Sequence, residues 1–275
     1  MRENFNGILI LSDLDGTFFG KKASIVPKNI EAIKHFNSLG GRFTYSTGRI
    51  FANLASAATV ASEIVNAPLS LANGSYVYDY FTSDVIDPMY ISEDAVVDMI
   101  NFAKANYPEA MYRISTSNGF YSEVYNPAYK NVVPGGYHIH PIEEWPRGNW
   151  LKLVFNGEAE MLAKLNEELK RRFEDIVCFS RSSVRLIEIQ AKGCTKAARV
   201  PWFKDYYRRQ GEDITIIACG DFDNDVEVLK AADISVCPSN ATEEVKRICD
   251  YCLCDHSEGL IADLINKIEQ GIIKI

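Results

Sequence analysis

The chain has 275 residues, 47% of them apolar, so it can bury one large core or two smaller ones. Its formal net charge of -8 argues against a nucleic-acid-binding surface and an anionic-membrane-binding surface, because both partners would be repelled over most of the molecule. A small anionic substrate remains compatible with this charge if a local cation or metal ion receives it.

The amino-terminal segment MRENFNGILIL lacks the basic start, apolar stretch and cleavage site of a secretory signal. No apolar run in the sequence is long enough to cross a bilayer, so we expect a cytoplasmic protein. Its seven cysteines are best interpreted as small buried side chains in a reducing compartment. The segment ICDYCLCDH, 248–256, offers three thiols and an imidazole, but it lacks the second cysteine pair typical of zinc sites, so a short core strand is expected.

The first part of the chain alternates between strand-like and helix-like segments. Apolar runs predict strands at 7–12, 42–46 and 68–72. Between them, helical periodicity predicts helices over 28–39 and 50–58. This alternation is typical of βαβ units in a parallel sheet.

From about residue 79 the pattern changes. An amphipathic helix is predicted over 92–105, and 112–124 is typical of two strands around an Asn-Gly turn. A loop rich in Pro, Gly and aromatic residues, 126–149, precedes a strand, helix, strand, strand series that ends near Gln190. These segments predict a mixed α+β unit inserted into the first one.

After Lys192 the alternation of helices and strands resumes. A helix is predicted over 195–209, where Pro201 should kink it or delay its start. The strand DITIIACGD, 213–221, follows, and further helices and strands alternate up to a last helix over 257–269. The predicted fold class is therefore α/β, a parallel-sheet domain with an α+β insertion.

Two aspartates, Asp13 and Asp15, follow directly on the first buried strand. Ligands of open parallel sheets bind beyond the carboxyl ends of the strands, and one intervening residue sends the two side chains to the same side. Two adjacent carboxylates repel each other unless a cation lies between them or one is protonated, and hard oxygen ligands favour magnesium. A plain Asp-Gly turn is the alternative interpretation of this segment.

Two other segments could bind phosphate. TYSTGR, 44–49, leaves a strand with hydroxyls and a glycine that could donate hydrogen bonds to a phosphate oxygen, although an ordinary helix cap is the alternative. Lys196, in GCTKAAR, follows the insertion and could neutralise phosphate charge, although an isolated lysine is more often a solvated surface residue.

A second acidic strand end lies in ACGDFDNDVEVL, 218–229. Asp221, Asp223, Asn224 and Asp225 follow an apolar strand there. Helix capping alone does not explain this density of charge, so a functional role is favoured over a solvated acidic loop.

Taken in order, DLDGT, STGR, the lysine after the insertion and GDFDND resemble the four motifs of the haloacid dehalogenase superfamily, especially its Cof-type phosphatases, over residues 8–265. LANGSYVYD also resembles the segment that precedes the large α/β cap of that family. The resemblance implies a Rossmann-like core domain, 1–81 and 191–275, with a cap domain at 82–190 above its site.

The resemblance also implies roles for individual residues. Asp13 would be the nucleophile that becomes an aspartyl phosphate, and Asp15 would protonate the leaving oxygen and later activate water. A magnesium ion would be held by Asp13, the backbone carbonyl of Asp15 and Asp221, with Asp225 nearby and acting partly through water. The residues expected to hold the phosphoryl oxygens are Thr47, Gly48, Lys196 and Asn224.

Some positions depart from the family pattern. Phe222 follows GD where a small or polar residue is common, and 257–260 read SEGL where an acid-Gly-Val pattern is frequent. Neither position performs the chemistry implied above. In the insertion, Lys130, His138 and His140 could touch a leaving group, but a packed cap loop is the favoured interpretation.

The expected partner is a small phosphorylated metabolite, with sugar phosphates first. A phosphomutase using the same nucleophile and a non-catalytic sugar-phosphate-binding protein are the alternatives. The binding protein would not need the set Asp13, Asp15, Lys196 and Asp221. A P-loop enzyme is disfavoured because the sequence has no GxxxxGK[ST] motif.

Overall fold

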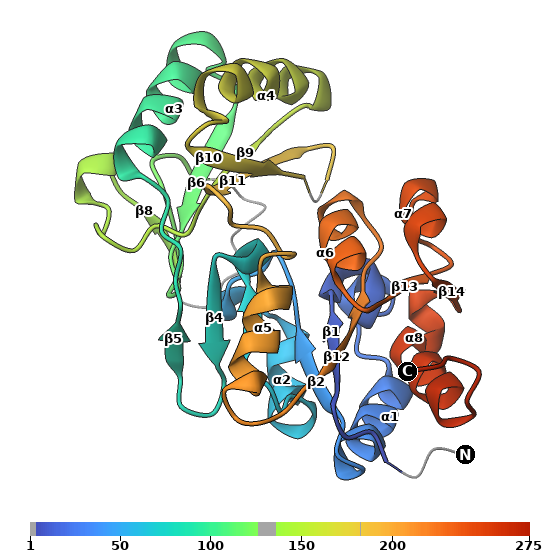
Figure 1. The fold of residues 1–275 in the computed structure, drawn as a ribbon. Helices are drawn as coiled ribbons and strands as arrows, with labels where there is room; N and C mark the ends of the chain where they lie inside the picture. Colours follow the sequence, from blue (N-terminus) through green and yellow to red (C-terminus); the bar gives the residue numbers. More distant parts are fainter. Residues whose placement is uncertain (1–3, 126–135, 182) are drawn as a thin grey trace.

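Five parallel strands form the central sheet in the computed structural model, which describes residues 4–125, 136–181 and 183–275 (Figure 1). Their order across the sheet is β14-β13-β12-β1-β2. The strands are β1 (Ile8–Ser12), β2 (Arg42–Tyr45), β12 (Thr215–Cys219), β13 (Ile234–Pro238) and β14 (Tyr251–Leu253). All five residues of β1 are buried, as expected of a parallel strand covered on both faces.

Helices cover both faces of this sheet. The apolar cluster on one face contains Ile8 and Ile10 of β1, and the cluster on the other contains Leu9 and Leu11, because successive side chains of a strand point to opposite sides. The first face is covered by α1 (Pro27–Ser38), α2 (Ser56–Ile64) and α8 (His256–Glu269). The second is covered by α5 (Arg199–Arg208), α6 (Val226–Ala231) and α7 (Glu243–Ile248).

A small antiparallel sheet continues from the β2 edge. It consists of β3 (Leu69–Leu71), β4 (Tyr76–Asp79) and β5 (Asp84–Ile86), and a bridge between Ser46 and Ser70 joins it to the end of β2. The boundary expected between residues 81 and 82 falls in the turn of the β4–β5 hairpin. The division into core and cap domains stays a prediction.

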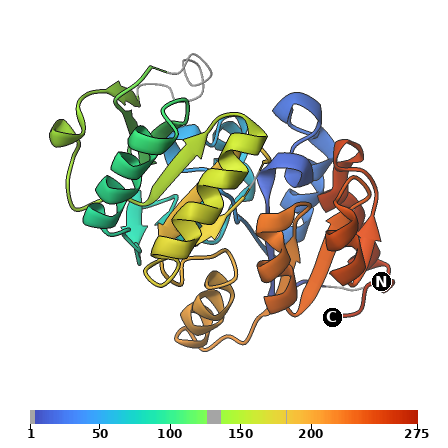
Figure 2. The ribbon, with the colours of Figure 1, turned by 90° about the horizontal axis from the view of Figure 1, so that it is seen from above.

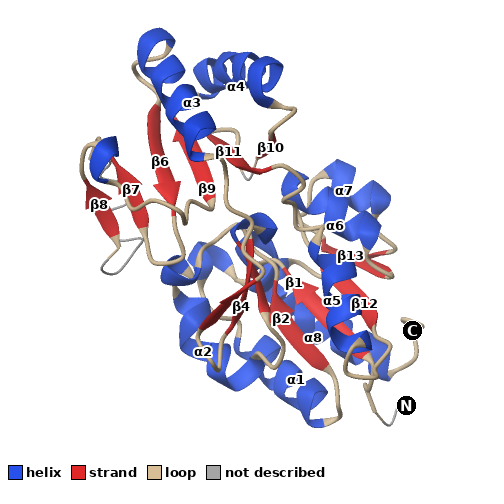
Figure 3. Cartoon of the chain, turned by 60° about the vertical axis from the view of Figure 1, so that its left-hand side comes forward, coloured by secondary structure: helices blue, strands red, loops and turns tan. Residues whose placement is uncertain are grey.

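Six strands form a separate sheet above the carboxyl ends of the parallel strands (Figure 3). All neighbours are antiparallel except β7 and β8. Two helices, α3 (Glu93–Asn106) and α4 (Ala159–Phe173), lie side by side on one face (Figure 2). In sheet order the strands are β10 (Val177–Ser180), β11 (Leu186–Ala191), β9 (Lys152–Asn156), β6 (Met111–Ser115), β7 (Phe120–Ser122) and β8 (Tyr137–Ile139).

The two faces of this six-stranded sheet differ in polarity. Tyr112, Leu153 and Ile187 belong to the apolar cluster under α3 and α4. Their neighbours in sequence point the other way, toward the parallel sheet, and several of them are polar. These neighbours include Arg113, Lys152 and Glu188, all of them buried.

Three sequence predictions need correction. The helix expected over 50–58 begins only at Ser56, because Phe51–Asn53 is a short 3₁₀ turn and Ala55 has a positive φ of 54°. The helix expected from Thr195 begins at Arg199, which is the delayed start expected as one effect of Pro201, and Pro201 lies in its first turn, where proline is tolerated. The expected core strand of the cysteine-rich segment is the edge strand β14, and its Cys252 is exposed.

Among the described residues, no helix combines the length and apolar character needed to cross a membrane. All seven cysteines are free thiols. The described residues contain one group of three metal-ligating side chains, and it includes no cysteine.

Phe36 tests the core beneath the parallel sheet, because its side chain is fully buried between α1 and β2. We expect Phe36→Ala to lower the free energy of unfolding by about 3–5 kcal/mol, measured by urea denaturation. The control is Phe81→Ala, since Phe81 is 66% exposed, and it should change that free energy by less than about 0.5 kcal/mol. Equal effects of the two variants would contradict this description of the core.

Candidate active site

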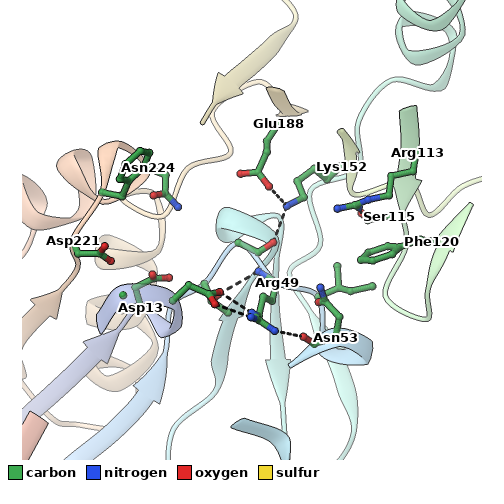
Figure 4. A pocket seen from close by; sticks show the side chains of 16 residues that line it. Asp13, Arg49, Asn53, Arg113, Ser115, Phe120, Lys152, Glu188, Asp221 and Asn224 are labelled. Carbon is green, nitrogen blue, oxygen red and sulfur yellow. Dashed lines mark hydrogen bonds and ion pairs between the residues drawn. The ribbon is translucent and has the colours of Figure 1, made fainter. Parts of the chain in front are cut away.

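The ends of three adjacent strands meet at one cavity. β1 leads into Asp13, β2 into Thr47 and Gly48, and β12 into Asp221. Ser12 is paired in register with Tyr45 and with Cys219, so the three loops leave the sheet at the same level. The cavity has a volume of about 270 Å³ and lies between these loops and the polar face of the six-stranded sheet (Figure 4).

Three carboxylates gather at the base of the cavity. One carboxylate oxygen from each of Asp13, Asp221 and Asp225 lies within 4.8 Å of the others. Lys196, which is buried, places its Nζ 2.7 Å from Asp13 Oδ1 and 2.6 Å from Asp225 Oδ1. One ammonium therefore faces three acidic side chains.

The charges in this group perturb one another. Burial raises the pKa of Asp13 well above its ordinary value, the carboxylates of Asp225 and Asp221 raise it further, and Lys196 offsets part of the increase. Burial and the nearby Asp225 raise the pKa of Asp221 to about 6. Burial alone would lower the pKa of Lys196, but the two adjacent carboxylates raise it. The single ammonium of Lys196 therefore balances only part of the negative charge of Asp13, Asp221 and Asp225.

The oxygen atoms of this group suit a hard divalent cation. Asp13 and Asp221 line the cavity, and Thr17 donates a hydrogen bond of 2.9 Å to Asp221 Oδ1, which orients that carboxylate. Asp225 lies deeper, and its Oδ2 accepts the backbone N–H groups of Asp221 and Phe222 at 3.0 and 3.2 Å. An all-oxygen set with excess negative charge is typical of magnesium and calcium sites.

Asp15 is held by an ion pair that the sequence prediction did not include. The chain turns over Leu14–Phe18, where Asp15 has extended backbone angles (φ −79°, ψ 119°) and Gly16 has a positive φ of 79°. Arg49 forms a two-pronged ion pair with the Asp15 carboxylate, with both N–O distances 2.7 Å. Arg49 also donates to the carbonyl of Asn53 at 2.9 Å, so Asp15 is fixed at the wall of the cavity, away from the group of three acids.

The residues predicted to hold phosphate divide into two sets. Thr47, Gly48 and Asn224 line the cavity, as do Asp13 and Asp15. Lys196 lies behind Asp13 and lines a neighbouring cavity. The structure thus brings all four near the acidic group but places only three on the cavity wall.

Several residues of the cavity wall were absent from the sequence prediction. Arg49 was quoted within STGR without a role. Most of the others belong to the loop after β2 or to the insertion: Ile50, Asn53, Arg113, Ser115, Phe120, Lys152 and Glu188. Gly16, in the loop after β1, and Phe222, in the loop after β12, also line the cavity. The sequence feature that could have identified the residues of the insertion is a charged residue inside an otherwise apolar strand, as in LKLVF and LIEIQ.

The loop residues singled out in the insertion contribute little to this cavity. The His138 ring stacks on the Tyr121 ring, with centroids 4.7 Å apart. His140 Nδ1 lies 3.4 Å from Glu144 Oε2. Neither is among the described residues that line the cavity. Lys130 lies outside the described residues.

Comparison with known proteins decides the family. A family model of haloacid dehalogenase-like hydrolases matches residues 10–265. The chain belongs to this family. It is similar to the 5-amino-6-(5-phospho-D-ribitylamino)uracil phosphatase YcsE of Bacillus subtilis, with 26% identity over 96% of each chain.

Solved structures support the same fold. A haloacid dehalogenase-like hydrolase from Bacteroides thetaiotaomicron has a TM-score of 0.82 at 22% identity and covers 95% of this chain and 99% of its own. A sugar phosphatase of haloacid dehalogenase subclass IIB has a TM-score of 0.79 at 20% identity, over 97% and 100% of the two chains. The predicted family and α/β fold class are confirmed, and the chain is a haloacid dehalogenase-like hydrolase.

Gly16 tests whether the acidic group is a metal site. Its φ is +79°, and a Cβ there would lie 2.3 Å from Asp221 Oδ2, so Gly16→Ala must displace that carboxylate. We expect the variant to bind Mg²⁺ about 10- to 100-fold more weakly in a calorimetric titration. The control is Gly211→Ala, which shares the positive φ but meets no atom within 4 Å of the added Cβ. Unchanged Mg²⁺ affinity in Gly16→Ala would exclude Asp221 as a ligand.

Proposed function

We propose that this protein hydrolyses small phosphate monoesters, foremost sugar phosphates, through an aspartyl phosphate on Asp13 and with magnesium. The observation that carries the proposal is the position of Asp13. Its buried carboxylate ends a parallel strand, contacts Lys196 and faces a cavity that also contains Asp15 and Asp221. A nucleophile and a separate acid/base group are therefore available on one wall.

In the proposed first step, a carboxylate oxygen of Asp13 attacks phosphorus while the bond between phosphorus and the leaving oxygen breaks. Asp15, released from its ion pair with Arg49 and protonated, donates its proton to that oxygen, and the alcohol leaves. In the second step Asp15 takes a proton from water, the water oxygen attacks phosphorus, and the bond to Asp13 breaks. Inorganic phosphate is released and both carboxyl groups return to their starting state.

The remaining polar groups would stabilise charge. A magnesium ion bound to Asp13, the Asp15 carbonyl and Asp221, with Asp225 close by, would offset the repulsion between carboxylate and phosphate. Thr47, Gly48 and Asn224 would donate hydrogen bonds to the phosphoryl oxygens, and Lys196 would add positive charge from behind Asp13. Because enzymes accelerate phosphate-monoester hydrolysis by up to about 10²¹-fold, positioning and preorganised charge must act together.

The roof of the cavity favours a hydroxyl-rich leaving group. Arg113, Ser115, Lys152 and Glu188 supply hydrogen-bonding groups on that side, and the ring of Phe120 offers an apolar surface. This mixture suits a sugar, which has polar edges and an apolar face. In this proposal residues 82–190 form a cap domain that selects the substrate, while 1–81 and 191–275 form the core domain that performs the chemistry.

The proposed compartment is the cytoplasm. Free thiols at all seven cysteines support it, since an oxidising compartment would favour disulfides.

Asp13 is the first residue to test. We expect Asp13→Asn to abolish phosphate release from sugar phosphates and aryl phosphates, because an amide is too weak a nucleophile to form the acyl phosphate. Release by the unmodified protein should require Mg²⁺ and stop with chelator. The control is Asp205→Asn, a surface substitution that should retain full activity.

Full activity in Asp13→Asn would eliminate the proposed nucleophile. Phosphate transfer that needs a bisphosphate activator and releases little free phosphate would favour the phosphomutase instead.

Asp15 can be tested through the leaving group. With nitrophenyl phosphate, whose leaving group needs little protonation, Asp15→Asn should still form the aspartyl phosphate but hydrolyse it slowly, because the base is missing. We expect a burst of about one nitrophenolate per active site, followed by slow turnover, in rapid-mixing experiments. Steady turnover at the unmodified rate without a burst would contradict the acid/base role.

A further inference from the structure

A buried ion pair of the six-stranded sheet contacts a loop of the parallel sheet. Lys152 lies on β9 and Glu188 on β11, and Lys152 Nζ is 2.6 Å from Glu188 Oε1 (Figure 4). The two side chains are 4% and 5% exposed. Lys152 Nζ also donates a hydrogen bond of 2.7 Å to the carbonyl of Gly48. This lysine therefore links the polar face above the cavity to the loop after β2.

The partner carboxylate reaches the same loops through Asn73. Glu188 Oε2 accepts a hydrogen bond of 3.0 Å from Asn73 Nδ2, and Asn73 Oδ1 accepts one of 3.4 Å from Asn224 Nδ2. The Asn73 backbone N–H donates to the carbonyl of Thr47 at 2.9 Å. A Cβ on Gly48 would lie 2.9 Å from Asn73 Oδ1, so the glycine packs closely on this amide.

These contacts fix two consecutive peptide planes. Because the peptide bond is planar, holding the Thr47 carbonyl also sets the direction of the Gly48 N–H, and holding the Gly48 carbonyl sets that of the Arg49 N–H. Asn73 holds the first carbonyl and Lys152 the second. The donors of this loop are therefore oriented partly by a side chain from the six-stranded sheet.

We infer that Lys152, Glu188 and Asn73 form a positioning unit that orients the phosphate-binding groups Thr47, Gly48 and Asn224. This inference rests on the proposed function, which assigns those three residues to the phosphate. The affinity for phosphate then depends on the six-stranded sheet lying over the parallel sheet.

A buried charge pair is an unusual way to join two parts of a protein. A pair of apolar side chains of similar volume often stabilises a protein at least as well, since charges lose their hydration on burial. Apolar side chains could not donate to the Gly48 carbonyl or accept from Asn73. The pair therefore supplies direction to the loop groups, which apolar packing cannot do.

Two variants separate this role from folding. Asn73→Gly removes the side-chain amide contacts to Glu188, Ser180 and Asn224 without backbone strain, since Asn73 has a φ of +56° that glycine adopts freely. The backbone hydrogen bond to the Thr47 carbonyl is kept. Lys152→Met/Glu188→Gln neutralises both charges, keeps similar volumes and removes the donor to Gly48. The control Lys104→Met/Glu123→Gln makes the same changes in another ion pair of the insertion. Neither Lys104 nor Glu123 lines the cavity.

The readout is binding of inorganic phosphate in the presence of Mg²⁺, measured by calorimetry together with the melting temperature. We expect each positioning variant to weaken phosphate binding about tenfold and to raise KM for nitrophenyl phosphate more than it lowers kcat. Mg²⁺ affinity and the melting temperature should stay close to those of the unmodified protein. The control variant should bind phosphate normally.

Phosphate affinity equal to that of the unmodified protein in both positioning variants would overturn the inference and leave the proposed function intact. A loss explained entirely by unfolding in both would also overturn it. An unmodified protein that binds phosphate but hydrolyses no ester would overturn the proposed function, and the binding comparison would still test the positioning unit. An unmodified protein that binds no phosphate would overturn both.

Discussion

Electrostatic repulsion at the ends of β1 and β12 is the constraint around which the site is arranged. Asp13, Asp221 and Asp225 each place a carboxylate oxygen within 4.8 Å of the others, although burial makes every such charge costly. The Lys196 ammonium balances part of this negative charge. The Asp225 carboxylate is stabilised further by the hydrogen bond that it accepts from the backbone N–H of Asp221. The sheet can hold this arrangement because apolar clusters on both of its faces fix the strands rigidly.

Much of the fold could be predicted from the sequence, and the reasons are local. The apolar run of β1 and the alternation of helices and strands around it identify a parallel sheet, and the carboxyl ends of parallel strands coincide in space. This geometry is why Asp13, Thr47, Gly48 and Asn224 could be assigned to one cavity from residues far apart in the chain. Helix boundaries were less predictable, since the positive φ of Ala55 has no signal in its own side chain.

The roof of the cavity was harder to predict, because its residues come from β6, β7, β9 and β11 and converge only through sheet pairing. Ser115 lies opposite Lys152, and Val154 lies opposite both Arg113 and Glu188. Nothing in the sequence gives this register in advance. The Arg49–Asp15 pair was missed for a related reason, since a side-chain contact between two loops depends on how their turns are oriented.

The short strand at the other edge of the parallel sheet has a consequence for solubility. β14 has only three residues, Tyr251–Leu253, and acidic side chains flank it at Asp250 and Asp255. A long, uncharged edge would offer its free backbone groups to a strand of another molecule. The brevity and flanking charge of β14 therefore disfavour pairing of this edge with a strand of another molecule.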